Sequence, residues 1–190
     1  MTEFCETAER NRSALHDLPV ALSTTLRATL EPEAEVDARF CEGITAPQLR
    51  ERRAYLLIAA DGGVPGAAAE WFDLGPSDRA SDDDPADPEV KAWGEHTLAL
   101  LQRDAARGDL GALAALETVY QYGGIATANA AQALTYQLAV QDLMVSDAQK
   151  FAPAELDLQR DAAARIASLL SADQRVAAEA AAAELVARAH

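Results

Sequence analysis

The sequence has 190 residues, of which 49% are hydrophobic, nearly a quarter are alanine and 5% are aromatic. Its net charge of −15 repels phosphate, which argues against nucleic acids and anionic membrane surfaces as partners. No run of about 18 apolar residues is present, so the sequence predicts no membrane insertion.

Alanine loses almost no side-chain entropy in a helix, and no Val/Ile/Thr-rich alternation of strand type persists along the chain. We therefore predict an all-α fold that forms a single domain over residues 1–190. Small side chains also allow helix axes to approach closely. Three parts are expected: N-terminal capping helices over 1–44, helical hairpins over 45–147, and a C-terminal capping helix pair over 153–190.

The N-terminal part contains both cysteines, Cys5 and Cys41. They lie at the edges of predicted helices, so a disulfide between them could fix one helix to the next, worth roughly 3–4 kcal/mol in the chain-entropy model. A disulfide requires an oxidising compartment, which predicts a bacterial periplasmic protein whose leader is not in this sequence. The alternative is two buried free thiols in a cytoplasmic protein.

Helix boundaries in the middle of the chain follow from caps and glycines. Thr45 to Gln48 has the form of a capping box and predicts a helix that runs to Ala60 and ends at Gly62. A short helix is expected from Pro65 to Leu74. The segment 75–88, rich in Asp, Pro and Ser, predicts a solvated acidic loop.

Calcium is the alternative interpretation of that loop, since carboxylates are calcium ligands. Its candidate ligands are four aspartates, namely Asp82, Asp83, Asp84 and Asp87. Pro85 stands among them and no glycine follows for the sharp turn that a calcium loop needs. We therefore predict no metal and no cofactor.

The second half of the chain reads as five helices. Asp87, Asp109 and Asn129 are the expected N-caps of helices over 88–107, 110–122 and 130–147. Gly108 and Gly123 are expected to end the first two in a left-handed conformation. Pro153 begins a helix that extends to 170, and a capping box at Ser171 begins the last, which extends to 189.

Two stretches of sequence align without a gap, 55–72 and 101–118, each containing an apolar helix, a glycine and a small-residue helix. After the second come Tyr120, Gly123 and the run from Asn129 to Ala139, with Ala133, Leu134 and Tyr136 at fixed spacing. This pattern resembles the Sel-one-like repeat, a relative of the tetratricopeptide repeat. The resemblance covers about half of the chain and implies a short α/α solenoid that binds a protein or peptide.

Catalytic motifs are missing from the sequence. It contains no Gly-x-Ser-x-Gly, no phosphate-binding glycine loop and no His-Glu-x-x-His. His96 and Glu95 are adjacent on a predicted helix and point about 100° apart, so they are not a preset acid/base pair. We predict a non-enzyme; an enzyme with a carboxylate-based site is the third alternative.

Candidate contact residues for a partner fall into two groups. Trp71, Phe72 and Trp93 flank the acidic loop and could form an aromatic hot spot, or else fill the core. The groove formed by successive first helices of the repeats offers four positions: Leu113, Glu117, Gln121 and Tyr122.

The predicted function is a monomeric, non-catalytic module that binds a protein or peptide, and the acidity favours a basic partner. One example is a periplasmic immunity or inhibitor protein that neutralises a toxin. The alternative is a structural or envelope-assembly subunit.

Overall fold

A computed structural model describes residues 51–76 and 87–189. Alpha-carbon contacts divide the chain into two compact units, Met1–Ala54 and Tyr55–His190, and nearly all of the described residues belong to the second. The predicted capping helices over 1–44, the Cys5–Cys41 pair and most of the acidic loop lie outside the described residues. A single domain over 1–190 stays a prediction.

The described residues form seven α-helices and one short 3₁₀-helix, with no strand among them, so the all-α prediction is confirmed for this part of the chain. In chain order the elements are α4 (Arg52–Asp61), α5 (Ala67–Leu74), α6 (Pro88–Ala105), α7 (Leu110–Tyr122), α8 (Ala130–Ser146), η2 (Ala148–Lys150), α9 (Pro153–Ala167) and α10 (Ala172–Ala189).

The starts of α6, α7, α8 and α10 were predicted correctly because side-chain caps determine them locally. The exception is α5, which begins at Ala67, two residues after the predicted Pro65, and has no side-chain cap. Asp87 accepts a hydrogen bond from the Glu89 amide, and Asn129 accepts from the amides of the first turn of α8. At α10 the capping box is present: the Gln174 side chain accepts from the Ser171 amide at 2.9 Å, and the Ser171 hydroxyl accepts from the Gln174 amide at 3.3 Å.

Helices α5, α7 and α10 end where predicted, and other helix ends differ by one to three residues. Helix α6 ends at Ala105, two residues earlier than expected, and α9 ends at Ala167, three residues earlier. Gly108 and Gly123 both have positive φ, 79° and 86°. For Gly123 the correction is that ψ is −159°, which is a region open to glycine but not the left-handed helical one.

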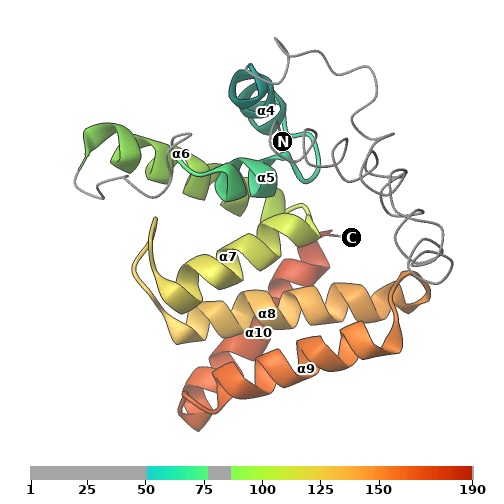
Figure 1. Ribbon diagram of the computed structural model, residues 1–190. Coiled ribbons are helices and arrows are strands. Elements are labelled where there is room, and N and C mark those ends of the chain that lie inside the picture. The colour runs from blue at the N-terminus through green and yellow to red at the C-terminus, as the bar shows by residue number, and fades with distance from the viewer. Residues whose placement is uncertain (1–50, 77–86, 190) are drawn as a thin grey trace, which may run out of the picture. The chain divides into compact units, whose positions relative to one another are not determined.

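Helices α7, α8 and α9 lie side by side, and α8 contacts both neighbours (Figure 1). Helix α10 crosses behind α8 in that view, and its last residue reaches the turn between α6 and α7: a Cβ added at Gly108 would lie 2.6 Å from the Ala189 Cβ. The predicted C-terminal pair therefore packs on α8 as two separate helices, since α9 and α10 make little contact with one another.

The core of this unit is built from alanine and leucine. Ala115, Ala133 and Ala139 are buried, which agrees with the expectation that small side chains allow helix axes to approach closely. Tyr120 and Tyr136 stack with ring centroids 5.6 Å apart and an interplanar angle of 6°. The largest fully buried side chains are Leu101, Leu113, Leu116, Leu134, Val119 and Thr97.

Candidate binding groove

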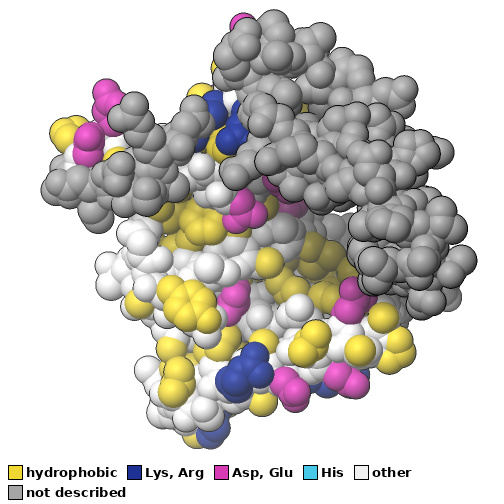
Figure 2. All heavy atoms as spheres, in the orientation of Figure 1, with side chains coloured by type: hydrophobic (Ala, Val, Ile, Leu, Met, Phe, Trp, Pro, Cys, Tyr) yellow, Lys and Arg dark blue, Asp and Glu magenta, His cyan; other side chains and the backbone are white. Residues whose placement is uncertain are grey.

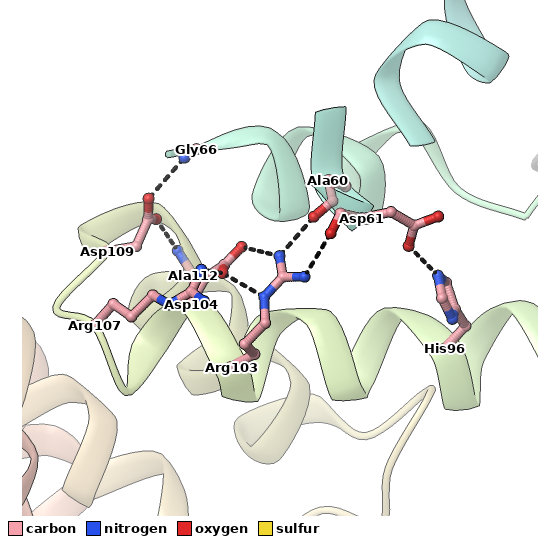
Figure 3. Close-up of polar contacts among 9 residues, drawn as sticks. All are labelled: Ala60, Asp61, Gly66, His96, Arg103, Asp104, Arg107, Asp109 and Ala112. Carbon is pink, nitrogen blue, oxygen red and sulfur yellow. Dashed lines mark hydrogen bonds and ion pairs between the residues drawn. The ribbon is translucent and has the colours of Figure 1, made fainter. Parts of the chain in front are cut away.

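Polar contacts tie the end of α4 to α6 and the start of α5 to the start of α7 (Figure 3), and we call this cluster the clasp: Asp61, His96, Arg103, Asp104, Arg107 and Asp109. Asp104 is 3% exposed and lies on the buried face of α6. Its carboxylate accepts from Arg103 at 2.8 and 2.9 Å and from Arg107 at 3.4 Å. The buried charge is therefore paired, as a buried carboxylate must be.

Arg103 carries the contact across to α4. Its guanidinium donates to the carbonyl oxygens of Ala60 at 2.5 Å and Asp61 at 3.1 Å, the last carbonyls of that helix (Figure 3). A cation at a helix C-terminus satisfies free carbonyls and interacts favourably with the helix dipole. The hydrogen bond to Asp104 raises the pKa of Arg103, so the group remains charged.

Asp109 holds two elements with one carboxylate. One oxygen accepts from the Ala112 amide at 2.8 Å and caps α7, while the other accepts from the Gly66 amide at 2.6 Å and so fixes the start of α5. This second contact was not predicted from the sequence, because it joins residues 43 positions apart.

His96 pairs with Asp61 and not with its neighbour Glu95. The Nε2 atom lies 2.8 Å from the Asp61 carboxylate, and both side chains are about half exposed. Glu95 instead lies 3.9 Å from Lys91. The His96–Asp61 pair joins α6 to the last residue of α4 and is partly exposed to solvent, so it adds one contact to the clasp.

No metal site is found among residues 51–76 and 87–189. In these ranges no group of three or more Asp, Glu, His or Cys side chains is placed so that it could hold a metal ion. Asp87, the described member of the four candidate calcium ligands, caps α6. Among the helices of this part of the chain, none combines the length and apolar character needed to cross a bilayer.

The predicted aromatic hot spot requires a correction at Trp71. This side chain is 6% exposed, packs in the core and donates its indole N–H to the Thr97 hydroxyl at 2.9 Å. Phe72 and Trp93 are partly buried and pack against the same core. Trp71 therefore serves as filler between alanine-rich helices, which is the alternative that the sequence left open.

A groove of about 350 Å³ lies along α7, α8 and α9. Helix α8 lies between α7 and α9 and contacts both (Figure 1), and residues of all three helices line the groove, with those of α7 and α9 as its walls. The buried side chains of Gln137, Val140 and Ile166 close the bottom. In Figure 2 the surface over these helices is mostly uncharged, with isolated acidic and basic side chains.

Three of the four predicted groove positions line this groove: Glu117, Gln121 and Tyr122. Tyr122 is 76% exposed at its edge. Leu113 requires a correction, because it is 1% exposed in the core and cannot contact a partner in this conformation. Leu113 lies about one helical turn before Glu117, but its side chain is on the side of α7 that packs into the core.

The groove also contains residues that the sequence reasoning missed, Gln137, Gln159 and Arg165. Gln137 is 5% exposed and donates its amide to the Gln159 side-chain oxygen at 2.6 Å and to the Gln159 carbonyl at 3.2 Å. Its position was detectable, since it falls on the apolar stripe of α8 with Leu134 and Val140. A polar residue on a buried helix face is a signal for a site.

Comparison of the chain with models of known protein families, with curated proteins and with solved structures found no match. The resemblance to Sel-one-like repeats and the regular solenoid that it implies therefore stay predictions, and the argument for function depends on the geometry of the groove.

Proposed function

We propose that this protein binds an extended segment of a protein partner in the groove between α7 and α9. The supporting observation is that Glu117, Gln121 and Tyr122, predicted as contacts from the sequence, open onto one cavity with the buried amide of Gln137. Convergent polar groups in a concave site are usual in binding pockets, and here Val140 and Ile166 supply the apolar part of a floor that also contains Gln137.

The dimensions of the groove fit a short stretch of peptide. Its lining on α7 extends from Ala114 to Tyr122, which at 1.5 Å per residue is about 12 Å. An extended chain advances about 3.3 Å per residue, so three or four residues of the partner would occupy it. Tyr122, exposed at the edge, offers the aromatic anchor that is typical of interface hot spots.

The net negative charge of the protein favours a basic partner through long-range electrostatic attraction. The net charge of −15 steers a basic protein toward this one and accelerates their encounter. A periplasmic immunity or inhibitor protein acting on a basic toxin is the finer proposal within this class, and it depends only on charge and size.

Site-specific photo-crosslinking tests the groove in the cells that make the protein. A photoreactive phenylalanine analogue replaces Tyr122, and in a matched protein it replaces Val176, which is 64% exposed on α10 and lies outside the groove. We expect a covalent adduct with one partner from position 122 and none from 176. The adduct is then identified by mass spectrometry.

A second pair of substitutions tests whether the crosslinked partner occupies the groove itself. Ala114→Trp fills the groove from its α7 wall, whereas Ala164→Trp adds the same bulk to an exposed position of α9 outside it. The adduct at 122 should disappear with the first and persist with the second. No adduct at 122, or an adduct that A114W leaves unchanged, would overturn the proposal.

A further inference from the structure

Glu117 is a carboxylate without a cationic partner among the described residues. Its hydrogen bond from the Thr118 hydroxyl is long, 3.4 Å, and the side chain is half-buried in the wall of the groove. Burial raises the pKa of Glu117, and the hydrogen bond from the Thr118 hydroxyl opposes this by a smaller amount. A cation brought into the groove would compensate for this loss of hydration.

Arg165 lines the same groove from α9, and its guanidinium makes no hydrogen bond or ion pair within residues 51–76 and 87–189. Other arginines of the C-terminal helices differ: Arg160 pairs with Asp157 at 2.7 Å, and Arg188 lies 3.8 Å from Glu184. Glu117 and Arg165 share one cavity yet are not within ion-pair distance of each other.

Glutamine amides accompany these two charges. Gln121 is exposed on the α7 wall, and Gln159 lies on the α9 wall, where it is held by Gln137. Gln121 offers both a donor and an acceptor, the same pair of groups that a peptide backbone presents, while Gln159, whose side-chain oxygen accepts from Gln137, offers its amide N–H groups. The groove thus presents a negative group, a positive group and amides in a space for three or four residues.

Building on the proposed function, we infer that the bound segment is dipolar. It places a lysine or arginine side chain against Glu117 and a carboxylate against Arg165, while its backbone hydrogen-bonds to Gln121 and Gln159. Charge-assisted hydrogen bonds are stronger than neutral ones, and Arg binds a carboxylate with two parallel N–H groups. The carboxylate comes from an Asp or Glu side chain or from the C-terminus of the partner, and the test below distinguishes these sources.

Selection from random dodecapeptide libraries tests this inference with the full-length protein. One library presents peptides with a free C-terminus and the other presents them with both ends blocked. The targets are the natural protein, Glu117→Gln and Arg165→Gln. Matched controls are Glu179→Gln on α10 and Arg160→Gln on α9, both exposed and outside the groove.

The natural protein should enrich peptides that contain a basic residue and a carboxylate within three or four positions. With E117Q the basic residue should lose its enrichment, and with R165Q the carboxylate should lose it, while both controls keep the full pattern. Each groove substitution should weaken binding of the best peptide about 10-fold, as expected for loss of one charge-assisted contact. Enrichment in the free C-terminus library alone assigns the carboxylate to the chain end.

The two proposals fail in different ways. Peptides that are enriched without any charge preference, and that bind E117Q and R165Q as tightly as the natural protein, would refute the dipolar segment and leave peptide binding intact. If neither library yields a peptide whose binding is blocked by Ala114→Trp, the proposed function fails together with the inference. Thermal unfolding of each variant, followed by circular dichroism, shows that the comparison is between folded proteins.

Discussion

The clasp and the groove use charged residues in opposite ways. In the clasp, Asp104 and Asp109 each satisfy two groups, and Arg103 joins a carboxylate to two carbonyl oxygens. In the groove, Glu117 and Arg165 share a cavity without pairing. A paired charge fixes the arrangement of helices, whereas unpaired charges that face one cavity remain available to a ligand. Substitutions at the two places should therefore affect different properties.

Asp104→Ala should give the largest loss of stability. It removes the acceptor of three charge-assisted hydrogen bonds from Arg103 and Arg107, whose guanidiniums are themselves partly exposed, and should cost about 2–3 kcal/mol of unfolding free energy. The measurement is urea unfolding of the full chain. The matched control is Asp157→Ala, which breaks an exposed pair with Arg160 and should cost no more than about 0.5 kcal/mol. Equal losses in the two variants would show that the clasp does not hold the fold.

Ala139→Leu should give the next largest effect. Ala139 is fully buried on α8, which is packed between α7, α9 and α10, so added methyl groups force the helices apart. Overpacking of this kind costs about 1–3 kcal/mol. Ala183→Leu, at an exposed position of α10, is the control and should be nearly neutral. Thermal unfolding measures both, and tolerance of leucine at 139 would contradict close packing of small residues.

Glu117→Gln should have the smallest effect on stability, and in the opposite direction. Because burial raises its pKa above 4.5, the folded protein holds this proton more tightly than the unfolded chain does. Stability is therefore lost as the pH rises from the unfolded pKa through the folded one.

The variant lacks this loss, so above that window it should match or slightly exceed the natural protein, by well under 1 kcal/mol since the group is half exposed. Unfolding measured from pH 4 to 7 gives the difference. A variant less stable than the natural protein at pH 7 would mean that Glu117 supports the fold.

Most helix starts could be predicted from the sequence, since capping is a matter of a few neighbouring residues. Asp109 illustrates the limit: its cap on α7 was predictable, while its contact with Gly66 was not. The C-terminal pair was predicted to pack on the helices before it, but the sequence did not indicate that α10 packs on α8, because alanine on several faces gives a helix no single apolar side. Which face of α10 is buried depends on the helices that it packs against in the folded chain.

The groove was predicted in part. Glu117, Gln121 and Tyr122 follow the spacing of one helix face, which placed them together, and Leu113 was included because the rotation of that face was estimated too coarsely. Arg165 carried no signal, since an arginine near the end of an amphipathic helix is common. Its place opposite Glu117 depends on how α9 lies along α8.

The central claim is that partner binding occurs between α7 and α9 and not at the clasp. Amide chemical shifts of the full-length protein, recorded by ¹H–¹⁵N NMR with and without the dodecapeptide most enriched on the natural protein, test it directly. The account predicts changes at the amides of Gln121 and Tyr122 and at the side-chain amides of Gln137 and Gln159, with none at His96. Changes confined to the clasp, or to the exposed face of α10, would contradict it.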